Sequence, residues 1–175
     1  MISISKATTA DHQLLARLGE QTFRESHGHS APQKDIENYA SEKFSDGAML
    51  KELSDAENIY HIISYNNEPA GFSKIILNAA HPLIKMTNVT KLERLYLLER
   101  FHRSKLGSTL FEFNVNFSRS NGQSGMWLYV WKENAKAIQF YLKHNFKVIG
   151  SYDFRLSPTH TNPNHQMFVE YSQGS

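Results

Sequence analysis

The sequence predicts one α/β domain spanning residues 1–175, with a mixed central sheet of about six or seven strands flanked by helices. Three observations lead to this prediction. The length of 175 residues is typical of a single domain. Hydrophobic residues make up 40% of the chain, which is enough for a packed core. Segments with the two-residue period of strands alternate with segments that have the period of helices.

The N-terminal part is predicted to be a short strand followed by helices. Residues 2–6 alternate as a strand does, and residues 8–11 have the polar composition of a helix start. One helical face then follows, made of Leu14, Leu15, Leu18 and Thr22. Residues 23–58 are predicted to form two or three short helices, because apolar side chains recur through an otherwise polar stretch.

The middle of the chain is predicted to form the centre of the sheet. Residues 59–65 and 70–77 read as a hairpin around a turn at residues 66–69. A polar loop at residues 78–90 leads to a third strand at residues 91–98. The helix after it is indicated by an apolar stripe of Leu106, Leu110, Phe113 and Phe117.

The C-terminal part is predicted to add three strands. Residues 125–131 form the first of them, and a helix follows it directly. Residues 148–156 and 165–171 form the other two, on either side of a loop that contains Pro158 and Pro163.

The composition excludes several classes of protein. Cysteine is absent, which removes disulfides, thiolate nucleophiles and cysteine-bound zinc. The histidine pair His27 and His29 lacks a carboxylate at the spacing of a helical metal site, so no metal is expected. These histidines read either as lining of an acceptor pocket or as surface residues. No basic run with interleaved aromatics indicates a nucleic-acid partner.

Targeting and membrane signals are missing as well. No window approaches the roughly 18 apolar residues of a membrane-spanning helix. The N-terminus lacks the apolar core of a signal peptide. We therefore expect a cytoplasmic protein without a membrane partner. Exposed strands and aromatic residues leave a homodimer open as an alternative to a monomer.

The net charge of +2 is unevenly distributed. Residues 1–57 carry six basic and ten acidic side chains, and the remainder carries thirteen basic and seven acidic ones. Two interpretations stay open. The asymmetry is either a property of solvated helix faces or the sign of a site that meets a cation on one side and an anion on the other.

The turn at residues 97–108 has the character of a phosphate-binding loop. Free N–H groups at the start of a helix bind phosphate oxygens. Gly107 lets a ligand approach the backbone, and Arg100, Arg103 and Lys105 add positive charge. An ordinary helix start with solvated arginines is the alternative.

A more specific pattern follows the strand at residues 125–131. Asn134 can cap the next helix, and Asn145 stands where a left-handed residue ends it. The pattern consists of Asn134, Ala137, Phe140, Tyr141 and Phe146. It resembles the second signature of the GNAT superfamily of acyl-CoA-dependent N-acyltransferases, Asn-x-x-Ala-x-x-Phe/Leu-Tyr followed by Gly-Phe, with Asn145 in place of the glycine.

The resemblance extends over the whole chain. The first signature of the superfamily, Gln/Arg-x-x-Gly-x-Gly/Ala, falls on residues 102–107, where only Gly107 is kept. Residues 68–71 and 92–97 resemble the hairpin and the acceptor strand of the superfamily. The helical stretch before them resembles the polyamine/diamine acetyltransferase-like branch.

The resemblance implies a binding mode for acetyl-CoA, the acetyl donor. Its pyrophosphate would lie on the backbone amides of Arg103, Ser104, Lys105, Leu106, Gly107 and Ser108. Its pantetheine would pair with the backbone of Leu95, Tyr96 and Leu97, and Asn134 belongs to the same donor site. A backbone N–H near Leu97 would polarise the thioester carbonyl.

The resemblance also implies catalytic roles. Tyr141, with an ordinary pKa near ~10, would protonate the leaving thiolate, although it could instead be a core aromatic. Glu93 is the candidate base, because strand alternation places it on the face of Leu95 and Leu97. An exposed strand carboxylate is the alternative. Tyr129 stands where the ribosomal-protein acetyltransferases of this superfamily carry a glutamate.

The predicted activity is direct transfer of an acetyl group to the primary amine of a small molecule. The acidic first third suggests a polyamine as this acceptor. Two alternatives remain: a CoA-binding regulatory protein with little turnover, and an acetyltransferase of a peptide or protein amine.

Overall fold

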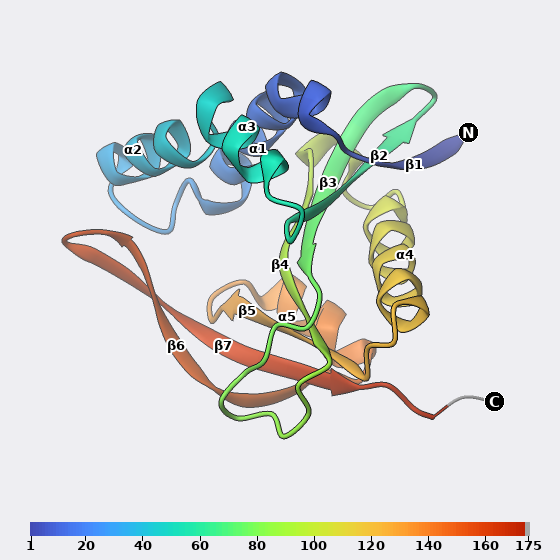
Figure 1. Ribbon diagram of the computed structural model, residues 1–175. Coiled ribbons are helices and arrows are strands. Elements are labelled where there is room, and N and C mark those ends of the chain that lie inside the picture. Colours follow the sequence, from blue (N-terminus) through green and yellow to red (C-terminus); the bar gives the residue numbers. More distant parts are fainter. Residues whose placement is uncertain (174–175) are drawn as a thin grey trace.

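The computed structural model describes residues 1–173, which form one seven-stranded mixed sheet with helices on both faces (Figure 1). The strands are β1 (Ile2–Lys6), β2 (Ile59–Tyr65), β3 (Glu68–Ile76), β4 (Val89–Leu97), β5 (Gly125–Trp131), β6 (Lys147–Ser157) and β7 (His160–Glu170). Their order across the sheet is β1-β2-β3-β4-β5-β7-β6. All neighbours are antiparallel except β4 and β5. The predicted α/β class and strand number are confirmed.

Two groups of helices cover the two faces of the sheet. The helices are α1 (His12–His27), α2 (Gln33–Lys43), α3 (Asp46–Ser54), α4 (Leu106–Ser120) and α5 (Ala135–Lys143). Helices α1–α3 bury Tyr60, Ile62 and Phe72 beneath them. Helices α4 and α5 cover the opposite face around Phe111 and Met126. Figure 1 shows α1–α3 gathered on one side of β2–β4 and α4 on the other. None of the helices among residues 1–173 is long and apolar enough to cross a membrane.

Side-chain caps fix where the helices begin. The Thr8 hydroxyl accepts a hydrogen bond from the Ala10 N–H, and Asp11 accepts one from the Thr8 N–H, which makes a capping box. Asn134 accepts from the Ala137 N–H at 3.2 Å and so starts α5. Asn145 has φ +68° after the end of α5, as its predicted left-handed position requires.

The buried line of α4 differs from the predicted stripe. Leu106 and Leu110 are buried as predicted, but Phe113 and Phe117 are only partly buried. Asn114 is fully buried in the next turn. The prediction was wrong for the second half of the helix, because a polar side chain occupies the position nearest the sheet.

A buried polar cluster explains the position of Asn114. Its Nδ2 donates to Ser73 Oγ at 2.8 Å, and its Oδ1 lies 3.0 Å from His61 Nδ1. The rings of Phe113 and Phe117 pack edge-on against the His61 ring, with centroids 4.9 and 5.0 Å away. A polar residue does not contribute to an apolar stripe, so the hydrophobic pattern of the sequence did not predict that Asn114 is buried.

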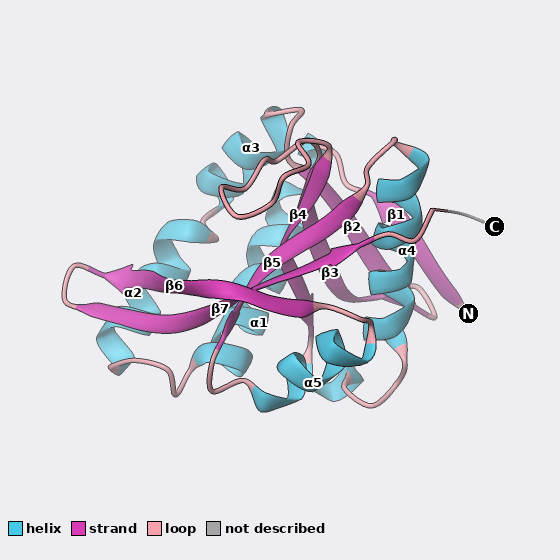
Figure 2. Cartoon of the chain, turned by 90° about the horizontal axis from the view of Figure 1, so that it is seen from below, coloured by secondary structure: helices cyan, strands magenta, loops and turns pink. Residues whose placement is uncertain are grey.

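The last two strands are longer than predicted. They form a hairpin whose turn lies between Ser157 and His160, and Pro163 belongs to β7 rather than to a loop. The proline lies at the end of the β5–β7 ladder, where its carbonyl accepts a hydrogen bond from the Lys132 N–H at 2.9 Å and no N–H of its own is needed to continue the ladder. Figure 2 shows this hairpin extending from the sheet toward α2.

Gly71 in β3 should be essential for the pairing of β3 with β4. A Cβ atom at Gly71 would lie 2.2 Å from the Tyr96 carbonyl oxygen, so Gly71→Ala has to shift a backbone strand. We expect the free energy of unfolding, measured by urea denaturation, to fall by about 1–3 kcal/mol. Gly47→Ala in α3 is the control, because its Cβ would meet no atom within 4 Å. Equal unfolding free energies for the two variants would contradict the prediction.

Candidate active site

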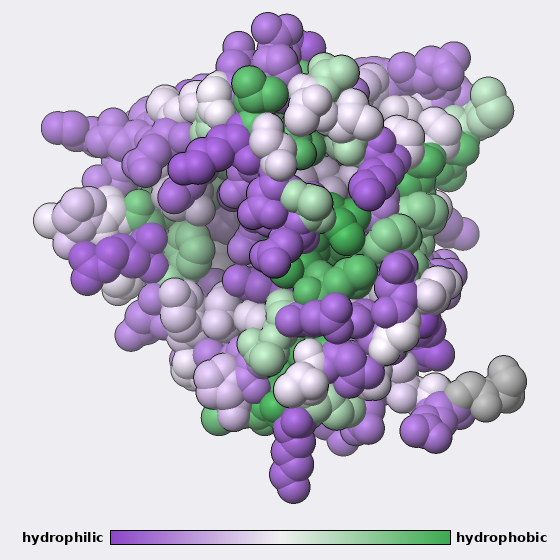
Figure 3. Space-filling view, viewed as in Figure 1, coloured by the Kyte–Doolittle hydropathy of each residue, from purple (hydrophilic) through white to green (hydrophobic). Residues whose placement is uncertain are grey.

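The site is organised by a split in the sheet between β4 and β5. These strands pair only from Val89 opposite Gly125 to Lys91 opposite Trp127. Beyond Lys91 they diverge, and within residues 1–173 the edge of β4 that faces β5 has no partner strand. A cavity of about 800 Å³ fills the opening and reaches both faces of the sheet. Figure 3 shows a hollow on one face, between the helical part of the molecule and the β6–β7 hairpin.

The free edge of β4 presents backbone groups to the cavity. The Leu98 N–H donates to the Ala70 carbonyl of β3 at 2.9 Å. Because successive residues of a strand point their backbone groups to opposite sides, the N–H groups of Leu95 and Leu97 face the opening. His102 Nε2 lies 3.1 Å from the Leu97 carbonyl on this side. The strand therefore offers donors and acceptors at the place predicted to hold the pantetheine.

A β-bulge changes the expected position of Glu93. Lys74 of β3 pairs with Arg94, but the next residue, Ile75, pairs with Leu92, so Glu93 is an extra residue in β4. Its carboxylate contacts Lys74, on the face covered by α1–α3. The prediction that Glu93 shares the face of Leu95 and Leu97 is wrong, because alternation fails across a bulge.

The turn between β4 and α4 exposes a run of backbone donors. Within residues 1–173, the N–H groups of residues 103–108 donate to no protein acceptor, and α4 has no side-chain cap. Arg103 and Lys105 have φ angles of +70° and +63°. Lys105 stands at the first glycine position of the signature over residues 102–107 and adopts the left-handed conformation that favours glycine. Phosphate oxygens fit these donors and the adjacent cations.

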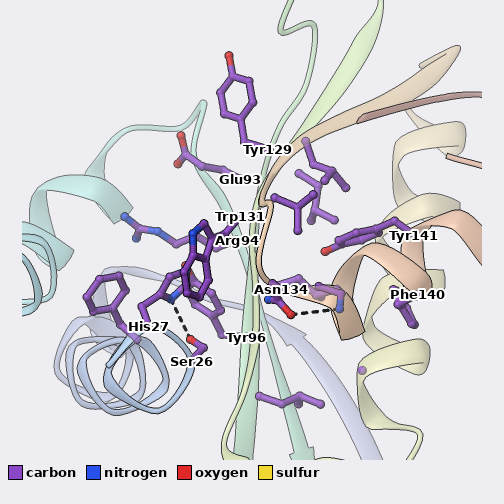
Figure 4. Close-up of a pocket in the computed structure, with 18 of the residues that line it drawn as sticks. Ser26, His27, Glu93, Arg94, Tyr96, Tyr129, Trp131, Asn134, Phe140 and Tyr141 are labelled. Carbon is purple, nitrogen blue, oxygen red and sulfur yellow. Dashed lines mark hydrogen bonds between the residues drawn. The ribbon is translucent and has the colours of Figure 1, made fainter. Parts of the chain in front are cut away.

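Tyr141 lies on the opposite wall, on α5. Its side chain is 9% exposed, and its ring packs against Phe111 and Phe146. Burial raises the pKa of its hydroxyl above the ordinary value, so the group is protonated at neutral pH. Figure 4 shows the hydroxyl directed toward the strands at the centre of the cavity, near Asn134. Tyr141 therefore packs in the core and also faces the cavity, as a proton donor to a bound ligand would have to.

An aromatic wall faces Tyr141 from the side of α1 and α2. His27 at the end of α1 stacks on Phe23, with centroids 4.9 Å apart, and approaches Tyr96 and Trp131 at 6.1 and 6.5 Å. Tyr39 of α2 also stacks on Phe23, with the ring centroids 4.7 Å apart. From the sequence, His27 was either a pocket-lining residue or a surface residue. The sequence gave no signal for Tyr39 or Trp131 as site residues.

The β6–β7 hairpin closes the cavity from below. Asn162 and Asn164 of β7 line it together with Tyr152 and Phe154 of β6. The hairpin contacts the helical layer. His160 Nε2 lies 2.9 Å from the carbonyl of Ser30 in the α1–α2 loop, and the Phe154 ring packs edge-on against Tyr39 of α2, with centroids 5.9 Å apart. The sequence predicts a loop at Asn162, which lies in β7, and so gives no indication of this wall.

The charged groups of the cavity form an ion-pair chain. Lys74 Nζ lies 2.7 Å from Glu52 and also contacts Glu93, which lies 3.3 Å from Lys91 Nζ. The cations around Glu93 hold its pKa below the usual range despite its burial. Of the ten acidic residues in positions 1–57, Glu52 is the one that lines the cavity. The acidic first third is therefore mostly solvated surface.

Burial of His27 should make stability pH-dependent. Burial lowers the pKa of His27 to about 4 in the folded protein, below the ordinary value near 6.5. Between these values the unfolded chain binds more protons, so the free energy of unfolding falls as the pH drops from about 6.5 to 4. Over this pH range, we expect the free energy of unfolding of His27→Gln to fall by up to about 3 kcal/mol less than that of wild type. Urea denaturation at a series of pH values measures it, and exposed His29→Gln is the control. Parallel pH profiles for wild type and His27→Gln would contradict the assignment.

Comparisons with known proteins agree with this architecture. Residues 17–146 match the sequence profile described as Acetyltransferase (GNAT) family. A spermidine N(1)-acetyltransferase from Thermoplasma acidophilum is 25% identical over 147 residues, which cover 84% of this chain and 89% of the relative. An uncharacterized N-acetyltransferase from the pepI 3′ region of Lactobacillus delbrueckii subsp. lactis is 24% identical over 140 residues, 80% of this chain and 81% of the relative.

Solved structures share the fold. The PaiA N-acetyltransferase of Thermoplasma acidophilum, solved in complex with coenzyme A, has a TM-score of 0.78 at 23% identity, covering 98% of this chain and 99% of that one. An acetyltransferase of GNAT family from Streptococcus pneumoniae has a TM-score of 0.68 at 21% identity, covering 98% and 100%.

Proposed function

The chain belongs to the acetyltransferase (GNAT) family, and on that basis we propose that it transfers the acetyl group of acetyl-CoA directly to the primary amine of a small molecule. One observation carries this proposal. The protonated hydroxyl of Tyr141 faces the same opening as the free edge of β4. An acid for the leaving thiolate and donors for the thioester carbonyl therefore meet in one cavity.

The donor half of the cavity fits the phosphates of acetyl-CoA. The free N–H groups of residues 103–108 would bind the pyrophosphate, and Arg103, Lys105 and Lys136 line the same side. The backbone of Leu95 and Leu97 would hold the pantetheine. Asn134 contributes indirectly, since its side chain is occupied in capping α5 and thereby positions Tyr141.

Tyr141 supplies the proton that the leaving thiolate needs when the amine attacks. The attacking amine also has to lose a proton, and we propose that Glu93 collects it through water, because Glu93 is the carboxylate of β4 that lines the cavity. Its ion pairs with Lys74 and Lys91 make it a weak base. The rise of kcat/KM with pH should therefore follow deprotonation of the acceptor amine.

A polyamine is the second candidate acceptor. One relative is named for spermidine, and Glu52 and Glu93 line the cavity. Both carboxylates already contact Lys74, so an ammonium of a polyamine would have to displace that lysine. The proposal for a simple primary amine does not require this step.

Two measurements test the proposed activity. Calorimetric titration should show acetyl-CoA binding, and a thiol-release assay should show turnover with members of a panel of amines, amino acids, polyamines and peptide N-termini. Binding without release from any amine would favour the regulatory alternative. Failure to bind acetyl-CoA would overturn the proposal.

A further inference from the structure

We propose that the acceptor carries a carboxylate besides its amine, as an amino acid does, and that Arg94 binds this carboxylate. The inference rests on the proposed acetyl transfer and narrows its acceptor class. It starts from the charges of the cavity: seven Lys and Arg side chains line it, against the two carboxylates Glu52 and Glu93. Three of the cations, Arg103, Lys105 and Lys136, lie on the donor side.

The two carboxylates are already matched. Glu52 pairs with Lys74 at 2.7 Å, and Glu93 pairs with Lys74 and Lys91. Arg94 is not part of this chain of ion pairs. No carboxylate within residues 1–173 lies within salt-bridge distance of its guanidinium. The rest of the cavity therefore holds four cations, Lys43, Lys74, Lys91 and Arg94, against two carboxylates, an excess of two positive charges.

Arg94 is held in place without being neutralised. Its Nη1 donates to the Tyr60 hydroxyl at 3.1 Å, and that hydroxyl donates to Glu52 at 2.9 Å. The guanidinium carbon lies 4.7 Å from the centroid of the Phe44 ring. The Tyr39 hydroxyl also lies beside the guanidinium. These partners are uncharged, so they fix the side chain without cancelling its charge. A partly buried, unmatched guanidinium favours an anion, and a carboxylate matches its two parallel donors.

Asn164 is a second, independent observation. Its side chain is only 8% exposed and lines the same cavity, and its Oδ1 is buried without a hydrogen-bond partner in the described chain. It lies in register with Trp131 on β5 and Tyr152 on β6. A buried acceptor without a donor costs stability, so this position favours a ligand N–H. A small molecule with both an amine and a carboxylate offers a donor for Asn164 and an anion for Arg94.

The wall between these groups is aromatic. Phe23, Tyr39, Tyr96 and Trp131 line the cavity around His27, which is neutral at pH 7. An apolar body packs well against such a surface. L-Phenylalanine is therefore a suitable probe, and two analogues test its carboxylate: L-phenylalaninamide, in which the carboxylate is an amide, and phenethylamine, which lacks it.

The test compares kcat/KM for each acceptor on wild type and on Arg94→Gln. We expect the variant to lose roughly 10- to 100-fold with L-phenylalanine and less than about threefold with either analogue. Because each ratio concerns one acceptor on two enzymes, differences in amine pKa cancel. Arg155→Gln removes the same charge from an exposed residue outside the cavity and should change none of the three ratios.

A measurement on wild type keeps the test independent of the variant's folding. 3-Phenylpropionate, which has the carboxylate but no amine, should compete with the acceptor, whereas 3-phenylpropanamide should not. Equal inhibition by both, equal losses with all three acceptors, or higher kcat/KM with spermidine than with any amino acid would overturn the inference. If acetyl-CoA binds but no amine releases thiol, the proposed function itself has failed.

Discussion

Replacing Tyr141 by phenylalanine is expected to lower kcat by roughly 10²–10⁴-fold, the usual contribution of one general acid. The aromatic ring remains, so its packing against Phe111 and Phe146 is kept and only the hydroxyl is lost. Because burial keeps this hydroxyl protonated, the wild type should show no loss of acid function as the pH rises to 9. Steady-state thiol release measures the effect.

The affinity for CoA separates this role from a structural one. Tyr141→Phe should bind CoA nearly as wild type does, since the donors for the phosphates lie in another element. Tyr65→Phe is the matched control: Tyr65 is exposed on β2, away from the cavity, and its loss should leave kcat unchanged. Wild-type turnover in Tyr141→Phe would show that Tyr141 is only a core aromatic residue and not the general acid.

The second large effect is expected for Gly107→Val at the start of α4. A Cβ at Gly107 would lie 3.3 Å from Leu97 Cδ1, and the two extra methyl groups of valine would crowd the free N–H groups of residues 103–108. Loss of one or two charge-assisted hydrogen bonds to phosphate corresponds to roughly 10²-fold weaker CoA binding. Calorimetry measures this directly.

Gly107→Ala is the control for Gly107→Val. Its single methyl group meets only the end of a leucine side chain, so the decrease in affinity should be small. Hydrogen exchange gives an independent measurement: CoA should protect the amides of residues 103–108 in wild type and in Gly107→Ala. Unchanged affinity in Gly107→Val would exclude this loop as the phosphate site.

The sequence predicted those parts of the site that depend on local structure. Asn134 is predictable because a cap acts within one helical turn, and the position of Tyr141 follows from it by helical periodicity. The same holds for the left-handed Asn145. The β4–α4 turn is predicted as a phosphate site from its charge and Gly107, but the left-handed conformation of Lys105 has no signal in the sequence.

The rest of the site depends on tertiary structure. The bulge at Glu93 has no glycine to mark it, and a one-residue insertion moves a strand side chain to the other face. A ligand-binding role for Arg94 can be inferred only once the structure shows that Lys74 contacts both neighbouring carboxylates. Asn164 can be placed in the wall of the cavity only when the true length of β7 is known. The proline at position 163 indicated a loop there instead.

The reach of the β6–β7 hairpin toward α2 implies a division of labour along the chain. The hairpin contributes Asn162 and Asn164 to the cavity and contacts Ser30 of the α1–α2 loop through His160, whereas the loop proposed to bind the donor precedes α4. Substitutions at the far end of the hairpin can therefore remodel the choice of acceptor while the donor machinery is inherited unchanged. In such a layout, changes in the hairpin need not disturb the residues of α4 and α5 on which the proposed chemistry depends.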